Sequence, residues 1–260
     1  MKMDPFAIRK YPRTPHVEGS RLGEGDEDLS QIRFEEILGR HLVIEEKVDG
    51  ANTAVSFNSA GELLLQSRGH YLTGGHREKH YNLFKTWATT YSSELLDVLS
   101  DRYIMYGEWL YAKHTVYYDL LPHYFLEFDV FDREEQLFLS TERRRELLRD
   151  LPVHSVPVLA EGVFHQPEQI LKYLSRSKYI SDSHTQNLRA TALRLGLNVE
   201  QIERETDPTN TMEGLYIKVE ENGCVTHRVK YVRASFLQTV VASESHWLQR
   251  PIVPNKLEIK

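Results

Sequence analysis

The sequence predicts an α+β fold in which antiparallel sheets are flanked by helices. The first observation is a series of short segments that are rich in aromatic and β-branched residues, as strands are. The second is a set of longer segments whose apolar residues recur at helical spacing. The third is Asn222-Gly223 between two alternating segments, which is a strong signal for a β-hairpin.

Helices and strands are predicted in order along the chain. A helix is expected over residues 26–38, ended by Gly39, and a second over residues 78–99. A third, over residues 141–148, has Thr141 as its expected N-cap. Residues 165–205 read as helical and polar, with interruptions at Pro167 and Gly196. The predicted strands lie within residues 41–57 (two strands around the turn Asp49-Gly50) and at residues 62–67, 103–110, 124–131, 213–219 and 225–232.

Length and composition limit the class of protein. The chain has 260 residues, 40% of them hydrophobic, so we expect one domain over residues 1–260, with an extended lead-in over residues 1–25 and a short helix and tail over residues 234–260. The net charge of −6 argues against a generic nucleic-acid coat, so any nucleic acid would bind in a local basic groove. The one cysteine, Cys224, excludes an internal disulfide and fits a reducing cytoplasm. Neither a membrane span nor a signal peptide is predicted, so we expect a cytoplasmic protein without a membrane partner.

The segment Lys47-Val48-Asp49-Gly50 is the first candidate for chemistry. A lysine at a strand end before a tight turn has a fixed backbone and projects from the sheet edge, which suits a nucleophile. An amine attacks phosphorus only when it is unprotonated, so nearby cations or a bound metal are expected to lower its pKa. The same residues also fit a surface lysine before an Asp-Gly turn, because short motifs often match by chance. Neither GxGxxG nor GxxxxGK[ST] occurs, so a nucleotide would be held in another way.

Five further segments follow Lys47 in a fixed order. They are Ser67-Arg68-Gly69, Tyr106-Gly107-Glu108-Trp109, the FLEFDV run at residues 125–130, the EGLYIK run at residues 213–218, and Arg228-Val229-Lys230. This ordered set resembles motifs I, Ia, III, IIIa, IV and V of the covalent nucleotidyltransferase superfamily, which contains polynucleotide ligases and mRNA capping enzymes. The resemblance covers residues 44–233, and its spacing is most similar to the ATP-dependent RNA ligases of the phage-type RNA ligase 2 group.

That resemblance implies a fold and an activity. The fold would be the nucleotidyltransferase fold, an ATP-grasp-like adenylation domain. About thirty residues follow Lys230, too few for the C-terminal OB domain expected of a DNA ligase or capping enzyme, so RNA is the expected substrate. Lys47 would attack the α-phosphate of ATP and hold AMP, with Mg²⁺ or Mn²⁺ as the metal. The AMP would then activate an RNA 5′-phosphate for attack by a 3′-hydroxyl, as in RNA repair.

The resemblance also implies roles for individual residues. Lys218, Arg228 and Lys230 are expected at the phosphates, where charge develops during the reaction. Arg228 departs from the lysine usual in the family, and an alternative register would use Lys230 and Arg233. Phe128 would stack on the adenine, and Asp49, Glu108 and Glu213 would hold the metal, largely through water. The implied nucleotide-binding residues are Glu46, Lys47, Asp49, Gly50, Arg68, Glu108, Phe128, Glu213, Lys218 and Lys230, and the implied RNA-binding residues are Arg68, His70 and Lys113.

Each of these residues also has an ordinary structural interpretation. The acids fit exposed strand positions, and Phe128 fits a core aromatic. The histidines at 70, 76 and 80 lack a matching set of acids or cysteines, so zinc is not expected. The basic and aromatic lead-in around Tyr11 is a candidate to fold back onto the nucleotide site.

Three functions therefore stay open at this point. The first is an ATP-dependent RNA ligase acting on RNA with 5′-phosphate and 3′-hydroxyl ends, with a separate end-healing kinase or phosphatase as a candidate partner. The second is a DNA ligase or capping-type nucleotidyltransferase without its usual extra domains. The third is a non-catalytic module that binds nucleotides or RNA ends.

Overall fold

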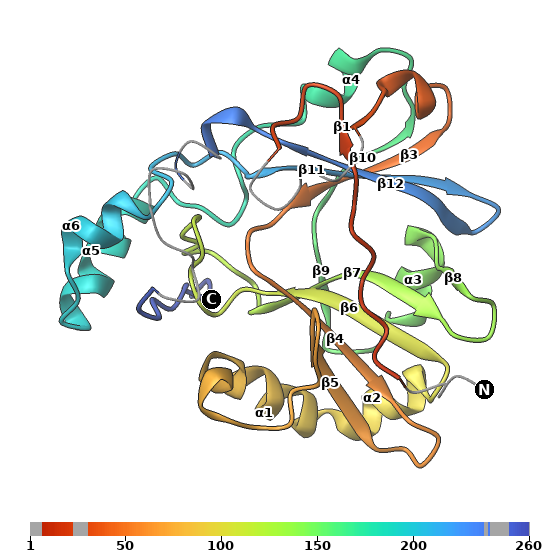
Figure 1. The fold of residues 1–260 in the computed structure, drawn as a ribbon, viewed down its shortest axis with the longest axis horizontal. Helices are drawn as coiled ribbons and strands as arrows, with labels where there is room; N and C mark the ends of the chain where they lie inside the picture. Colours follow the sequence, from red (N-terminus) through yellow and green to blue (C-terminus); the bar gives the residue numbers. More distant parts are fainter. Residues whose placement is uncertain (1–6, 23–30, 237–238, 240–249, 260) are drawn as a thin grey trace.

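The computed structural model describes residues 7–22, 31–236, 239 and 250–259 (Figure 1). It contains two sheets, and together with the helices around them they confirm the predicted α+β class. The first sheet has the order β10-β3-β11-β12-β1-β2, with β10 (Val158–Val163), β3 (His41–Lys47), β11 (Gly214–Glu221), β12 (Cys224–Val232), β1 (His16–Val17) and β2 (Gln31–Ile32). The second has the order β5-β4-β6-β7-β8, with β5 (Leu63–Ser67), β4 (Ala51–Phe57), β6 (Tyr103–Trp109), β7 (Phe125–Asp132) and β8 (Leu137–Phe138).

Most of these strands pair antiparallel, as predicted. The exceptions are β1, which is parallel to β12 and to β2, and the short β9 (His154–Ser155), which is parallel to β7. The β11–β12 hairpin turns at Asn222 and Gly223, whose φ angles are 52° and 75°. Positive φ at both central residues is what the tight hairpin turn requires, so the Asn-Gly signal is confirmed.

The helices cover the outer faces of the sheets. The 3-10 helix η2 (His76–Tyr81), α1 (Asn82–Thr90) and α2 (Ser92–Leu99) lie against the second sheet, and α4 (Pro167–Leu171) lies beside β10 (Figure 1). α5 (His184–Arg194) and α6 (Val199–Arg204) form a pair at one side of the molecule (Figure 1). α3 (Thr141–Leu147) follows β8. No described helix is long and apolar enough to span a membrane.

Four helix predictions need correction. Residues 165–205 are helical only in part: α4 begins at Pro167 instead of being interrupted there, and residues 172–183, between α4 and α5, are not helical. Residues 31–38 form β2 and one 3-10 turn, η1 (Phe34–Glu36), instead of a helix, because β2 pairs with β1; residues 23–30 lie outside the described part. The helix at 78–99 begins within the 3-10 helix η2 and is broken at Tyr91, which separates α1 from α2. Thr and Ser side chains around this break compete for backbone hydrogen bonds, as the Thr90 hydroxyl does by donating to the Thr86 carbonyl. The N-cap of α3 is Ser140, whose hydroxyl accepts from the amide of Arg143, while the Thr141 hydroxyl donates to Glu220.

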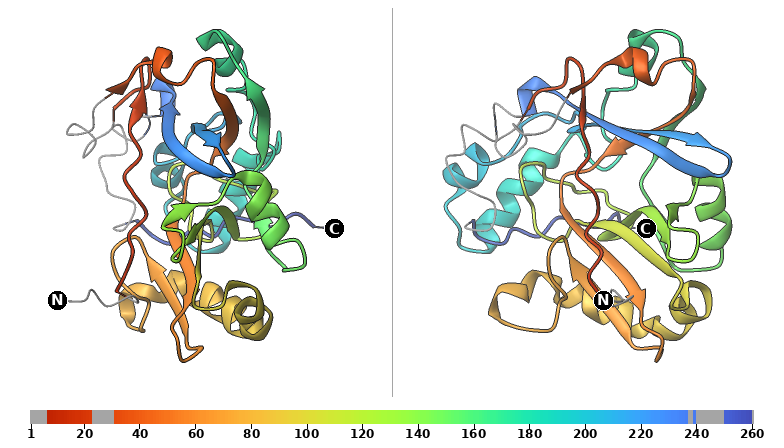
Figure 2. Two further views of the ribbon diagram at one scale, coloured as in Figure 1. Left: turned by 90° about the vertical axis from the view of Figure 1, so that its right-hand side faces the viewer. Right: turned by 45° about the vertical axis from the view of Figure 1, so that its right-hand side comes forward.

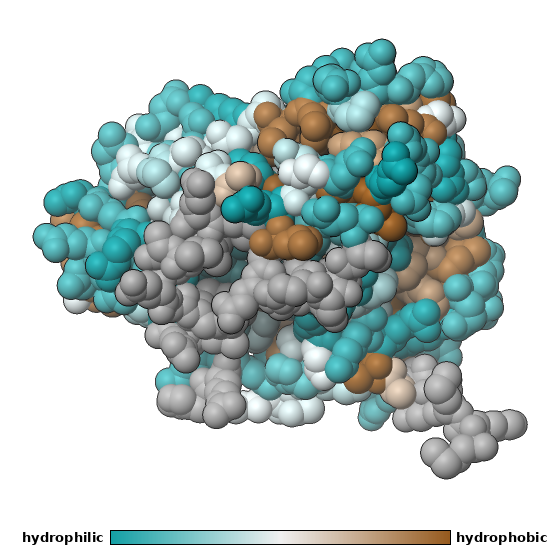
Figure 3. Space-filling view, turned by 45° about the horizontal axis from the view of Figure 1, so that its top comes forward, coloured by the Kyte–Doolittle hydropathy of each residue, from teal (hydrophilic) through white to brown (hydrophobic). Residues whose placement is uncertain are grey.

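Several described segments of the chain cross from one sheet to the other. One is residues 156–157, which lead from β9, paired with β7 of the second sheet, to β10 of the first. Residues 47–51 lead from β3 in the first sheet to β4 in the second, and the lead-in runs from β1 down to the second sheet, as Figures 1 and 2 show from three directions. After β12, residues 234–236 are helical, and residues 250–259 are extended, with bridges from Pro254 to Ala112 and from Leu257 to Leu121. On the face shown in Figure 3 the described surface is mostly hydrophilic, with hydrophobic side chains in small groups.

Candidate active site

A cavity of about 1080 Å³ lies between the two sheets. Its walls come from β3, β11 and β12 of the first sheet, from β4, β6 and β7 of the second, and from the loop after β5. Of the residues implied by the sequence, it brings together Glu46, Lys47, Gly50, Arg68, His70, Glu108, Phe128 and Lys230.

Strand pairing places Lys47 beside an acid. β3 pairs with β11 so that Lys47 lies opposite Gly214, and the Lys47 Nζ is 2.7 Å from Oε1 of Glu213. The lysine side chain is 24% exposed, whereas Glu213 is buried. A Cβ at Gly214 would lie 1.9 Å from the carbonyl oxygen of Tyr231, so only glycine allows these strands to approach in this way.

A second acid reaches the turn after Lys47. Asn52 of β4 lies opposite Glu108 of β6, and Oε1 of Glu108 accepts a hydrogen bond of 3.2 Å from the Gly50 amide. A Cβ at Gly50 would lie 2.7 Å from the Trp109 carbonyl oxygen, so this turn also needs glycine. Burial raises the pKa of Glu108 to about 8 and the pKa of Glu213 to about 7, although Lys47 opposes both shifts.

The electrostatics of Lys47 differ from the prediction. Burial by itself would lower the pKa of the lysine, but attraction to Glu213, Glu108 and Asp49 outweighs burial and raises it. Of the two expected causes of a lowered pKa, nearby cations are contradicted, because the charged groups that act most strongly on Lys47 are acids. Lowering of this pKa by a bound metal stays a prediction. Neutralising the two cavity acids would remove this stabilisation of the ammonium form.

The acids fit a divalent cation only in part. Among the residues that the structure describes, no three His, Cys, Asp or Glu side chains converge as direct metal ligands. Oε2 of Glu213 is buried without a hydrogen-bond partner, and Glu108 lines the cavity, so these two acids fit a magnesium ion that keeps most of its waters. Asp49 does not join them, because its carboxylate accepts from the amides of Thr115 and Val116 at 2.7 and 2.8 Å.

Two expected phosphate ligands, Lys218 and Arg228, belong to a mostly buried set of charges that we call the floor cluster: Glu45, Glu127, Asp129, Arg144, Lys218 and Arg228. Of these six residues, Glu45 also lines the cavity. Lys218 is fully buried, 2.9 Å from Glu45 and 3.1 Å from Asp129. Arg144 bridges Glu45 and Glu127, and Arg228 lies 3.5 Å from Asp129. The structure therefore does not bring Lys218 or Arg228 to the cavity, because acids on neighbouring strands hold both cations. Lys230, two residues beyond Arg228, does line it.

Of the three expected RNA-binding residues, two line the cavity and one is buried away from it. Arg68 and His70 are exposed at the cavity, and Nδ1 of His70 lies 2.9 Å from the Ser67 hydroxyl. Lys113 is buried instead, with its Nζ donating to the carbonyls of His114 and Glu205 at 3.0 Å each. Burial lowers the pKa of Lys113 to about 7. This lysine supports the chain around it and cannot reach RNA in this conformation.

The alternative register with Arg233 is also contradicted. The Arg233 guanidinium is buried, forms an ion pair with Asp207 and donates to the Met212 carbonyl at 2.8 Å. It therefore fixes the chain next to β11 and does not line the cavity.

Another part of the cavity wall consists of aromatic side chains. Phe128 and Tyr216 line it together with Tyr11 from the lead-in, and Val156 adds an apolar contact surface. Glu46 also borders the cavity, and burial raises the pKa of its carboxyl group to about 7.

The sequence analysis missed several lining residues. Asn52 has a buried Oδ1 without a hydrogen-bond partner, and its position two residues after Gly50 was the available signal. Tyr216 and Lys218 are two residues apart on β11 and so share a face of the strand. This spacing could have indicated that Tyr216 is a lining residue. His80 and Tyr81 end the 3-10 helix η2. From the sequence, His80 was considered as a zinc ligand, and only the tertiary fold brings both side chains to the cavity.

Comparisons with known proteins agree with this geometry. A Naegleria gruberi RNA ligase mutant solved with ATP and Mn has a TM-score of 0.50 and 18% identity, with 89% of this chain and 63% of that chain covered. A mutant of the same ligase with AMP and Mn has a TM-score of 0.51 and 17% identity, with 88% of this chain and 63% of that chain covered. An archaeal ATP-dependent RNA ligase has a TM-score of 0.50 and 16% identity, with 88% of this chain and 49% of that chain covered. The chain thus spans less than two thirds of the length of these structures, whose likeness shows the fold.

A search of the curated proteins gives no match. The model of the RNA ligase family matches residues 40–232, which is well over half of the 260 residues. The chain therefore belongs to the RNA ligase family.

Proposed function

We propose that this protein is an ATP-dependent RNA ligase that forms a covalent adenylate on Lys47. The observation that carries the proposal is the position of Lys47, whose amine lies in the wall of a large cavity, 2.7 Å from Glu213 and beside Glu108. The same cavity holds a cation, Lys230, and an aromatic wall formed in part by Phe128. Membership of the RNA ligase family and likeness to ligases solved with ATP or AMP and Mn support it.

In the first step, the Lys47 amine attacks the α-phosphorus of ATP. A P–N bond forms, the bond to the β-phosphate breaks, and pyrophosphate leaves. The ammonium must first lose a proton, to the surrounding carboxylates or to water, because only the free amine has a lone pair. A divalent cation, when bound, would neutralise phosphate charge and the negative charge of Glu108 and Glu213, which we assign to hold it.

In the later steps, the AMP passes to an RNA 5′-phosphate, and a 3′-hydroxyl attacks that phosphate and releases AMP. Lys230 is assigned to the phosphates and Phe128 to the adenine. Arg68 and His70, both exposed at the cavity, are assigned to the RNA end. Single-domain organisation, action in RNA repair with a separate end-healing kinase or phosphatase, and a cytoplasmic location remain predictions.

The test is covalent labelling. The protein is incubated with Mg²⁺ and ATP labelled at the α-phosphate, denatured and separated on a gel. We expect label on the wild type, no label on Lys47→Ala, and normal label on Lys172→Ala, which removes an exposed lysine outside the cavity. Label on Lys47→Ala would refute the assignment of the nucleophile.

A chase separates the competing functions. Loss of label on addition of 5′-phosphorylated RNA, with joined RNA as product, is expected. Labelling by GTP in place of ATP would favour a capping-type enzyme, and joining of DNA nicks only would favour a DNA ligase. Binding of ATP without any label would favour the non-catalytic module.

A further inference from the structure

The lead-in is attached to both sheets. At one end, His16 of β1 lies opposite Lys230 of β12, and the Lys230 amide donates to the carbonyl of Pro15 at 2.9 Å. At the other end, the Arg9 carbonyl accepts from the Tyr106 hydroxyl at 2.8 Å and from Gln66 at 3.0 Å. Figures 1 and 2 show this segment crossing between the sheets. We call residues 9–15 the strap.

The inner side of the strap forms part of the cavity wall. Tyr11, Pro12 and Thr14 line the cavity that contains Lys47. Tyr11 is buried, and its hydroxyl donates to Asp129 of the floor cluster. The Tyr216 hydroxyl lies 2.8 Å from the hydroxyls of both Tyr11 and Thr14. Burial raises the pKa of Tyr11 well above its usual value, so its hydroxyl stays protonated as a donor.

The ring of Tyr11 supports Phe128. The two rings meet edge to face, with centroids 5.1 Å apart and an interplanar angle of 79°. Tyr11 is itself enclosed by Tyr106 at 5.1 Å and Phe138 at 5.7 Å. Phe128 is only partly buried, so this contact fixes the ring that we assign to the adenine.

The departure at Arg228 is explained by the same contacts. Its guanidinium lies 4.0 Å from the centroid of Phe138 and 5.4 Å from that of Tyr11, and 3.5 Å from Asp129. A planar guanidinium can stack on rings and pair with a carboxylate at once, which a lysine ammonium does less well. Arg228 thus anchors the strap.

We propose that the strap is an integral part of the nucleotide site and that Tyr11 is a positioning residue, which holds Phe128 and Asp129 in place for the adenine nucleotide. This inference rests on the proposed function. Tyr11 acts on binding and not on the chemistry at Lys47, since its own contacts are with Phe128 and Asp129. The acids that flank the lysine are placed by β6, which carries Glu108, and by the start of β11, which Glu213 directly precedes.

The test measures the rate of self-adenylation against ATP concentration for Tyr11→Ala and Tyr11→Phe. Loss of an edge-to-face contact and of a hydrogen bond to a carboxylate predicts that Tyr11→Ala raises the half-saturating ATP concentration about tenfold. Tyr11→Phe, which keeps the ring, should raise it about threefold. The rate at saturating ATP should change less than about twofold for both, because the nucleophile and its acids are untouched.

A matched control is Tyr173→Ala. Tyr173 also meets a ring edge to face, Phe164 at 6.4 Å, but does not line the cavity. Tyr173→Ala should leave both the half-saturating ATP concentration and the rate at saturating ATP unchanged. The affinity for a non-hydrolysable ATP analogue, measured directly, should fall with Tyr11→Ala and not with the control.

The outcomes separate the two proposals. A wild type that takes no label from ATP contradicts the proposed function itself. A labelled wild type with an unchanged half-saturating concentration in Tyr11→Ala overturns the strap inference, and so does a loss confined to the saturating rate. If Tyr11→Ala does not fold, Tyr11→Phe and Thr14→Val decide, and normal ATP dependence in both overturns the inference.

Discussion

The charges of the floor cluster and the charges around Lys47 in the cavity wall are arranged in opposite ways. In the floor cluster, Lys218 and Arg144 are fully buried and each contacts two acids, so the acids there are matched by cations. In the cavity wall, Lys47 faces both Glu108 and Glu213, and burial raises the pKa of these two acids to about 8 and about 7. In the floor cluster each acid already has a cation, so these charges hold the strands in place. Around Lys47 the acids are in excess, so a bound cation would stabilise this part of the cavity wall.

The largest effect is expected from unbalancing the floor. Lys218→Met leaves Glu45 and Asp129 buried without the cation that both contact, 2.9 and 3.1 Å away. Breaking a buried pair in this way should lower the free energy of unfolding by about 3–5 kcal/mol, as measured by urea denaturation. The exposed Lys172→Met is the control and should stay within about 0.5 kcal/mol. A loss below about 1 kcal/mol for Lys218→Met would mean that the floor is not held by its charge pairs.

Local signals explain what the sequence predicted well. The turn after Lys47 and the β11–β12 hairpin depend on short-range patterns, Asp-Gly and Asn-Gly. The pairing that brings Glu213 and Glu108 to Lys47 joins strands far apart in the sequence, and it was expected only because the ordered motifs resemble a known family. Gly50 and Gly214 likewise have no room for a Cβ because of Trp109 and Tyr231, which are distant from them in the chain.

Long-range packing explains the rest. The alternation of side chains along β11 and β12 predicts on which face of the sheet Lys218 and Arg228 lie. It does not predict that acids on β3 and β7 pair with them. Lys113 appeared exposed in the sequence because Glu205, whose carbonyl it reaches, is far away in the chain. The strap is held at the cavity by contacts with residues such as Phe128, Asp129 and Tyr216, which no local pattern contains.

The second effect concerns an acid of the cavity wall, Glu46. Burial raises its pKa to about 7, so between about pH 4.3 and pH 7 the folded state holds a proton that the unfolded chain has released. The contribution of this group to stability is therefore present at low pH and lost as the pH rises through 7. Glu46→Gln removes the ionisation, and its free energy of unfolding relative to wild type should rise by up to about 3 kcal/mol between pH 4.5 and pH 8.

Urea denaturation at pH 4.5, 6 and 8 measures this difference. Glu35→Gln is the control, since the side chain of Glu35 is 70% exposed, and its difference from wild type should stay small at each pH. A Glu46→Gln difference that is the same at all three values would show that Glu46 ionises normally and that the wall carries no such excess of charge.

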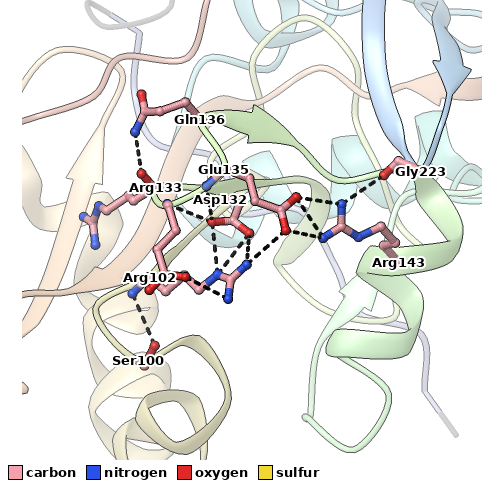
Figure 4. A network of polar contacts seen from close by, with 9 residues as sticks. Ser100, Arg102, Asp132, Arg133, Glu135, Gln136, Arg143 and Gly223 are labelled. Carbon is pink, nitrogen blue, oxygen red and sulfur yellow. Dashed lines mark hydrogen bonds and ion pairs between the residues drawn. The ribbon is translucent and has the colours of Figure 1, made fainter.

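The smallest effect is expected at a pair whose acid, Asp132, is buried like the acids of the floor but whose cation, Arg102, reaches the surface. Arg102 donates to both oxygens of Asp132, at 3.1, 3.0 and 2.6 Å, while the amides of Glu134 and Glu135 donate to the same carboxylate (Figure 4). Burial alone would raise the pKa of Asp132, but these hydrogen bonds outweigh it and lower the pKa overall. Arg102 remains 30% exposed, so solvent weakens the pair.

Asp132→Asn should therefore cost about 1–2 kcal/mol of unfolding free energy at pH 7, less than Lys218→Met. The cost should shrink as the pH falls from about 4, where Asp132 of the unfolded chain takes up a proton, through the lowered pKa of the native carboxyl group, where the contribution is lost. Glu146→Gln is the control for full exposure: its partner Arg149 and Glu146 itself are 63% and 64% exposed, and the change should stay within about 0.5 kcal/mol. If Asp132→Asn costs as much as Lys218→Met, burial of the cation does not distinguish the floor from this partly exposed pair, and the contrast between floor and wall would have to rest on charge balance alone.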